Sequence, residues 1–164
     1  MSDPAPPLKS ELSAALGRVP SGLFILTLRH ESRAGGMLAS WVQQAGFEPP
    51  MISVAVRLDR YQLDWMDAAG RFTLNQLPAG RKALLRHFAR GFEPEEPAFE
   101  GLALADVDAS GPVLSDALAW LDAEIVGGMD SGDHRVVLGR VRAGGLLQHD
   151  AEPAIHIRRE GSRY

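Results

Sequence analysis

Short apolar or alternating runs recur along this chain, separated by turns, and few stretches have the character of a helix. The runs at residues 23–28, 37–42, 51–57, 71–75, 120–126, 135–141 and 154–158 are predicted to be strands. Short helices are expected at about residues 10–17, 61–68 and 80–90. This balance favours an all-β protein, a small closed or partly open β-barrel with helical insertions.

Particular residues set several of these boundaries. Ser10 and Asp59 are the expected N-caps of the first two helices, and Gly70 is expected to end the second. Glycines and aspartates at residues 127–133 predict the turn between the strands on either side. Residues 91–101, with two prolines and several acidic or aromatic side chains, are predicted to form a surface loop. No linker is long enough to divide the chain into separate domains.

The length of the chain fits one compact domain. At 164 residues a chain can bury about 70% of its unfolded surface. We expect residues 10–164 to form that domain and the proline-rich residues 1–9 to form a flexible N-terminus. The first residues contain no apolar signal core, and no later run reaches the length of a membrane span. A cytoplasmic location, with no membrane partner, is the resulting expectation.

Charge and cysteine content exclude several classes of function. With a formal net charge of −4 and a pI near 5.7, the chain lacks the basic footprint of a general nucleic-acid binder. It contains no cysteine, which excludes disulfides, thiolate nucleophiles and cysteine-held iron–sulfur or zinc sites. Any redox chemistry must therefore use a borrowed cofactor.

Residues 35–56 combine a glycine pair, small and hydroxyl side chains, a double proline and an apolar strand. Gly35 and Gly36 allow backbone N–H groups to approach a ligand closely, and the small residues after them leave that approach open. Pro50 suits the first residue of a strand, where no ladder donor is needed. The order fits a loop wrapped around a flat ligand, and it also fits a hairpin with a long loop between two core strands.

Five ordered segments carry a resemblance to a known family. They are GRVPSGLFILT at residues 17–27, GMLASW with QQAGFEPP at 36–50, FTLNQL at 72–77, FARGFEP at 88–94 and GDHRVVLGRV at 132–141. In this order the chain resembles the flavin reductase-like family, the FMN-binding split barrels, over roughly residues 12–164. The GMLASW and FARGFEP segments most resemble a subgroup also found fused behind diiron flavoproteins.

The resemblance implies a split barrel that binds FMN, with FAD or riboflavin as further flavins it could use as substrates. NADH or NADPH would visit as a transient donor of hydride, and a partner oxygenase or another acceptor would take the electrons. It also implies a homodimer, because family members hold their flavin near a subunit interface. A flavin-binding electron-transfer module without turnover, or a split barrel for another planar ligand such as haem, is the alternative.

The residues expected at the flavin lie in three places. By resemblance they are Met37, Leu38, Ala39, Ser40, Trp41 and Pro50, then Asn75, Gln76 and Leu77, then Arg81 and Lys82. Basic residues in the first turn of a helix oppose its dipole unless an anion lies nearby, so Arg81 and Lys82 are expected to bind the FMN phosphate. Core packing by Trp41, an Asx turn at Asn75 and solvated basic side chains are the alternatives.

His134 follows a glycine turn at the start of a strand, within the sequence Gly-Asp-His. Family members carry this sequence on the side from which the nicotinamide approaches. The resemblance therefore gives His134 the catalytic position, where it would hold the nicotinamide or the flavin edge. A turn histidine bonded to Asp133 or Asp130 is the alternative.

Other patterns are absent or altered. No G-x-G-x-x-G follows a strand, so a Rossmann-type nucleotide site is not supported. Family members commonly have Ser or Thr where Leu38 stands, so one hydroxyl is missing from the expected flavin segment. No metal site is expected, because four candidate side chains lack any metal-ligand spacing and look like turn and surface residues. These are His149, Asp150, Glu152 and His156.

Overall fold

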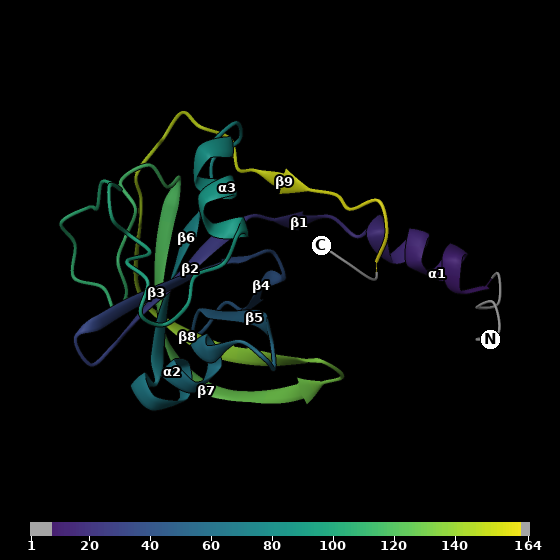
Figure 1. Ribbon diagram of the computed structural model, residues 1–164, viewed down its shortest axis with the longest axis horizontal. Helices are drawn as coiled ribbons and strands as arrows, with labels where there is room; N and C mark the ends of the chain where they lie inside the picture. The colour runs from purple at the N-terminus through teal and green to yellow at the C-terminus, as the bar shows by residue number, and fades with distance from the viewer. Residues whose placement is uncertain (1–7, 162–164) are drawn as a thin grey trace.

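Seven antiparallel strands form the body of the molecule, and two short helices pack against it (Figure 1). The computed structural model describes residues 8–161. The strands are β2 (Phe24–His30), β3 (Arg33–Ala39), β4 (Val42–Gly46), β5 (Met51–Arg57), β6 (Arg71–Gln76), β7 (Ala119–Ser131) and β8 (His134–Leu146). Their order in the sheet is β3-β2-β6-β7-β8-β5-β4.

The two edge strands of this sheet, β3 and β4, follow one another in the chain. Only Ser40 and Trp41 join the two edges. The backbone N–H of Ala55 in β5 donates to the carbonyl of Trp41 at 3.0 Å, which holds this link in place. The sheet therefore curls into a barrel that stays open between β3 and β4. This confirms the predicted all-β split barrel, and we call the opening the split.

Alternating side chains of the central strands fill two hydrophobic layers. Leu26 and Phe72 belong to the layer inside the barrel. Ile25 and Leu77 belong to a second layer, which packs under helix α3 (Lys82–Ala89). Because both faces of β2 are covered, residues 24–28 are all buried, and all but Thr27 are apolar, so the strand does not alternate between apolar and polar residues.

Helix α2 (Tyr61–Ala69) packs against β2, β3 and β6. Gly70 ends it in the left-handed conformation, φ +66°, and donates its N–H to the carbonyl of Met66 at 2.8 Å, as predicted. The expected N-cap at Asp59 is wrong. Arg60 occupies the N-cap without a side-chain bond, because the Asp59 carboxylate instead pairs with Arg57 at 2.8 Å.

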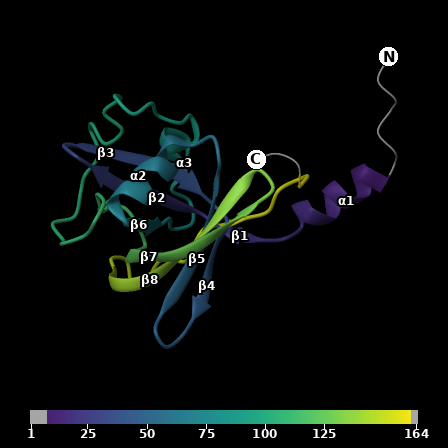
Figure 2. The ribbon, with the colours of Figure 1, turned by 90° about the horizontal axis from the view of Figure 1, so that it is seen from below.

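An arm projects from one side of the barrel (Figures 1 and 2). It contains α1 (Leu8–Gly17), β1 (Ser21–Gly22), β9 (Ile155–His156) and the residues that follow β9. β1 and β9 pair antiparallel, and the N–H of Arg158 donates to the carbonyl of Gly17 at 3.1 Å. The two ends of the described chain therefore hold each other in the arm.

The start of α1 differs from the prediction. The helix begins at Leu8, so Ser10 lies within it and is not its N-cap. Residues 1–7 of the predicted flexible N-terminus lie outside the described residues. Between residues 8 and 161, no helix is both long and apolar enough to span a bilayer.

Two strand predictions also need correction. The strand β4 was not expected, and the glycine pair before it lies within β3 rather than in a loop. The turn expected across residues 127–133 is only Gly132 and Asp133, because Ser131 already pairs with His134. The register of β7 shifts between Ile125 and Gly127. Glycine here marks a bulge in a long strand, not its end.

Candidate functional site

A cavity of about 370 Å³ lies at the split, which we call the inner cavity. The end of β3, β5, the first turn of α2 and one face of α3 form its walls. Its apolar lining includes Met37, Leu38, Leu85 and Phe88. Its polar lining residues are Ser40, Arg57, Arg60, Gln62, His134 and His156. A largely apolar chamber of this size with a few polar groups suits a small-molecule ligand.

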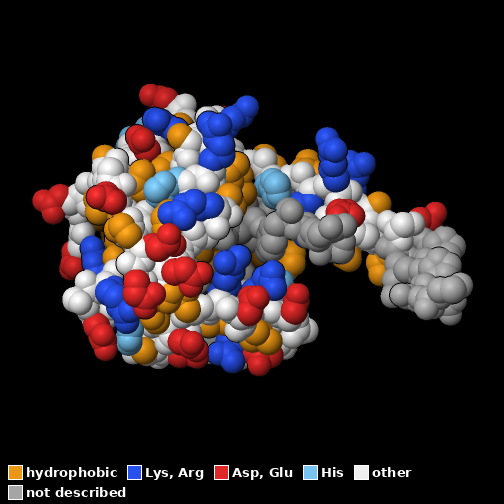
Figure 3. All heavy atoms as spheres, viewed as in Figure 1, with side chains coloured by type: hydrophobic (Ala, Val, Ile, Leu, Met, Phe, Trp, Pro, Cys, Tyr) orange, Lys and Arg blue, Asp and Glu red, His pale blue; other side chains and the backbone are white. Residues whose placement is uncertain are grey.

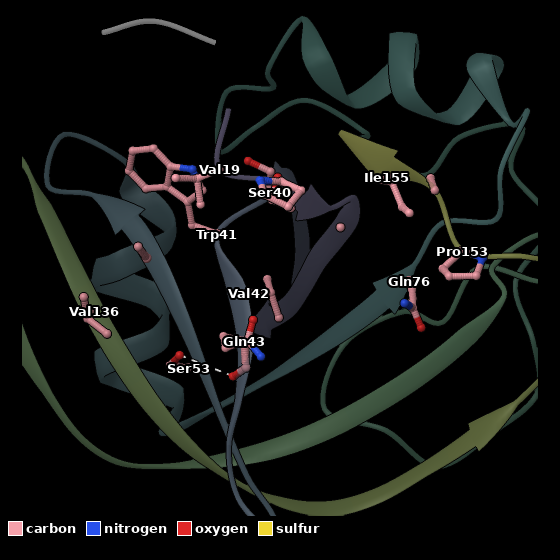
Figure 4. Close-up of a pocket in the computed structure, with 15 residues that line it drawn as sticks. Val19, Ser40, Trp41, Val42, Gln43, Ser53, Gln76, Val136, Pro153 and Ile155 are labelled. Carbon is pink, nitrogen blue, oxygen red and sulfur yellow. Dashed lines mark hydrogen bonds between the residues drawn. The ribbon is translucent and has the colours of Figure 1, made fainter. Parts of the chain in front are cut away.

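A second hollow of about 530 Å³, the outer groove, opens between the barrel and the base of the arm (Figure 4). Trp41, Val42, Gln76 and Ile155 are among its lining residues. The arm stands out from the body in the space-filling view (Figure 3). Ser40 and Ala55 line both the outer groove and the inner cavity. The two hollows thus share a wall at the split.

The predicted flavin segment lies at this shared wall. Met37, Leu38, Ala39 and Ser40 line the inner cavity, while Trp41 lines the outer groove. The indole of Trp41 packs on the imidazole of His134, with ring centroids 4.7 Å apart. The guanidinium carbon of Arg158 lies 5.1 Å from the Trp41 ring. Trp41 is therefore half-buried between His134 and the arm.

The glycine pair has a different role from the one expected. A Cβ at Gly36 would lie 2.8 Å from Cε1 of Phe88, and a Cβ at Gly35 would lie 3.0 Å from Cζ3 of Trp65. Neither residue lines the inner cavity. The pair makes room for aromatic rings on both faces of β3, and the expected approach of its backbone to a ligand is not supported.

His134 is buried, with 7% of its surface exposed, and lines the inner cavity. Its Nδ1 lies 2.7 Å from Oδ1 of Asp133. The hydrogen bond from His134 is the main reason why the pKa of the Asp133 carboxyl is lowered. An ionised carboxylate can only accept a hydrogen bond, so Nδ1 carries the proton that it donates to Asp133. The other ring nitrogen, Nε2, lies on the side of the ring away from Asp133. His134 therefore both contacts Asp133 in the turn and lines the inner cavity.

Asn75 does not face either hollow. Its side chain is fully buried, and its amide nitrogen donates to the carbonyls of Ile25 and Pro112, at 3.3 and 3.2 Å, and to the hydroxyl of Thr27 at 3.2 Å. Its carbonyl accepts the N–H of Leu114 at 2.8 Å. Both ends of the amide are committed to protein partners, so the expected recognition of a flavin edge by this side chain is wrong.

The neighbours of Asn75 divide between the core and the groove. Gln76 is half-buried and lines the outer groove. Leu77 is buried under α3, and its backbone N–H and carbonyl pair with Leu23 and Ala154. Pro50 is exposed in the turn before β5 and lines neither hollow, so its expected contact with a ligand is not supported.

Arg81 and Lys82 lie at the start of α3, outside both hollows. Arg81 is the N-cap, makes no capping bond, and pairs with Asp116 at 3.5 Å. Both side chains are exposed. An isolated antiparallel β-bridge between Pro78 and Pro153 joins the segment before this helix to the rim of the outer groove.

The sequence patterns missed four polar residues of the inner cavity. Arg57, Arg60 and Gln62 lie at the end of β5 and the start of α2, and His156 lies in β9 rather than on a plain surface turn. The only hint in the sequence was that the polar Gln62 stands next to the apolar Leu63 in a predicted helix. Its burial, at 2% exposed, could not be read from that position.

The model of the flavin reductase like domain matches residues 16–163. This chain belongs to the flavin reductase like domain family. The diflavin flavoprotein A 1 of Synechocystis sp. is 38% identical to it over 158 residues, which are 96% of this chain and 28% of that protein. The family predicted from the ordered segments is thus confirmed, while the chain spans well under a third of this longer relative.

Solved structures agree with the family. The NADH:FAD oxidoreductase SgcE6 of Streptomyces globisporus superposes with a TM-score of 0.81 at 26% identity, over 92% of this chain and 87% of that one. The same protein in complex with NAD and FAD fragments gives a TM-score of 0.79 at 25% identity, over the same shares. Membership of this family supports flavin binding and either a flavin reductase or an electron-transfer role.

Proposed function

We propose that this chain binds FMN at the split and uses NADH or NADPH to reduce flavin, which then supplies an acceptor. The observation that carries the proposal is the wall that the inner cavity and the outer groove share at Ser40, beside His134. An elongated ligand with a flat ring and a polar tail fits two hollows that share a wall better than one compact chamber.

The lining residues fit a flavin. The apolar side chains of Leu38, Leu85 and Phe88 suit an aromatic ring, and buried Ser40, Gln62 and His134 each hold a polar atom with no partner among the described residues. Such atoms are rare and costly, so they suggest a ligand that pairs with them. Gln76 on the groove suits the polar tail.

Bound flavin would accept a hydride from a nicotinamide. The side chains of this chain, which has no cysteine, offer no redox group that could do so. The protein's part is to bind and orient the two rings and to exclude water. His134 would orient the nicotinamide through Nε2, since Asp133 fixes the other ring nitrogen. Trp41, packed on His134, would keep the imidazole from turning away.

A homodimer forms part of the proposal. Five large apolar side chains are exposed along the arm, and they are Leu12, Leu16, Val19, Ile155 and Ile157. Exposed apolar surface of this kind marks interaction sites. A partner copy on the arm would lie beside the outer groove, which the arm helps to line. Sedimentation equilibrium should give twice the 17.7 kDa chain mass, and a monomer at micromolar concentration would contradict a stable dimer.

The proposed activity predicts a yellow protein, with flavin absorption near 450 nm, that oxidises NADH or NADPH when FMN is added. FAD and riboflavin serve as comparison substrates. Flavin binding without turnover of any pair would instead favour the electron-transfer module. A Soret band, or indifference to all three flavins, contradicts the proposal.

In the same assay, His134→Ala should raise the KM for the nicotinamide nucleotide by about tenfold, the value of one lost hydrogen bond or ring contact. The affinity for flavin should change little. His149→Ala is the matched control, because that histidine lines neither hollow. An unchanged KM in the His134 variant removes this residue from the nicotinamide site.

A further inference from the structure

Three buried polar atoms without protein partners lie on residues of one cavity. They are Oγ of Ser40, Oε1 of Gln62 and Nε2 of His134, and among the described residues only Arg140 adds another such atom. Ser40, Gln62 and His134 are 4%, 2% and 7% exposed. Leaving a buried polar group unpaired costs about 1–3 kcal/mol. The gathering of three around one chamber points to a ligand that satisfies them together.

The orientation of the Gln62 amide is set by the protein. Its Nε2 donates to the carbonyl of Gly36 in β3 at 3.5 Å. A backbone carbonyl can only accept, so the amide nitrogen must point at Gly36 and the oxygen must be the free end. The side chain therefore presents an acceptor, held from behind by a strand, to whatever occupies the inner cavity.

The neighbouring imidazole adds to this preference. In the neutral tautomer whose Nδ1 proton points to Asp133, the ring of His134 presents a lone pair at Nε2. Two of the three unpaired atoms are then acceptors, and the Ser40 hydroxyl can act either way. A ligand that carries N–H donors would therefore pair best with these atoms of the cavity wall. A haem edge carries carboxylates and no N–H donor, so it would leave the two acceptors, on Gln62 and His134, unpaired.

We propose that Gln62 determines specificity by accepting an amide-type N–H from the edge of the ring ligand in the inner cavity. Two ligands of the proposed function carry this group: flavin, as the imide N3–H, and nicotinamide, as its carboxamide NH₂. The inference rests on the proposed function and adds to it a residue on α2 that the ordered sequence motifs do not include.

Matched ligand pairs test it. The first arm compares the Kd of riboflavin with that of 3-methylriboflavin, which lacks the imide N–H. The second compares the KM of NADH with that of the reduced 3-acetylpyridine analogue, in which a methyl group replaces the amide nitrogen. Each ratio is measured in the wild type, in Gln62→Met, in the smaller Gln62→Ala and in Gln44→Met. The intrinsic reactivity of each ligand cancels between variants.

Gln44→Met is the control, because Gln44 is exposed and lies outside both hollows. In one of the two arms, the wild type and this control should both bind the analogue about tenfold or more weakly than its parent ligand. The Gln62 variants should lose most of that preference in the same arm, and this arm identifies the ring. A purely structural role would weaken both ligands of a pair equally. Thermal unfolding of each variant shows that it is folded.

Two results would overturn the inference, and only the second would also overturn the proposed function. If the wild type binds flavin and oxidises NADH but the Gln62 variants keep its preference in both arms, only the role of Gln62 fails. If the wild type binds no flavin and oxidises no nucleotide, the proposed function fails as well.

Discussion

Replacing Asn75 with alanine is expected to lower the free energy of unfolding of the ligand-free protein by about 3 kcal/mol, from a lost buried hydrogen-bond partner and a small cavity. The N–H of Leu114 would lose its acceptor, and the loop that carries Pro112 would lose a tether to β6. Urea unfolding followed by tryptophan fluorescence measures the change.

Gln76→Ala is the neighbouring control, because Gln76 is half-buried and lines the outer groove. It should cost under about 1 kcal/mol of stability, as for a substitution outside the core. The folded Asn75 variant should bind flavin within about twofold of the wild type. If it instead keeps its stability and loses flavin affinity, the amide contacts ligand and our correction of its role is wrong.

The double variant Arg81→Ala with Lys82→Ala is expected to weaken FMN binding by about 10- to 100-fold. A hydrogen bond to a charged group contributes about 1.5–3 kcal/mol, and each 1.4 kcal/mol is tenfold in Kd. The ion pair between Arg81 and Asp116 is half-exposed, so its loss alone should change stability little. Riboflavin, which has no phosphate, should bind the variant within about twofold of the wild type. Fluorescence titration with both flavins measures this.

The inner cavity offers a competing site for the phosphate. Arg57 and Arg60 line it, and Arg57 is already paired with Asp59. Arg57→Ala with Arg60→Ala is therefore the comparison variant. If it shows the FMN-selective loss while the Arg81 and Lys82 variant does not, the tail lies in the inner cavity and the helix start has no ligand role.

Local patterns were enough to predict the fold and the family. Strands such as residues 51–57 and the cap at Gly70 depend on nearest neighbours, and the ordered segments place residues 37–41 at the split. Patterns of this kind indicate which residue types stand next to one another. They do not show what packs across the barrel.

The corrected residues of the candidate site depend on distant partners. The amide of Asn75 is consumed by Pro112 and Leu114, in a loop without regular structure that no local pattern positions. Gly36 is small because Phe88 lies against it, more than fifty positions later in the sequence. Gln62 lies within a predicted helix, and only the folded barrel buries it.

The walls of the inner cavity come from residues as far apart as Leu23 and His156, so the chamber does not exist until nearly the whole polypeptide has found its place. A guest that enters it cannot stabilise one hairpin alone. Occupancy and global folding are thermodynamically linked, and a ligand present at a hundred times its Kd adds about 2.7 kcal/mol against unfolding. The supply of flavin would then regulate the lifetime of the protein as well as its activity.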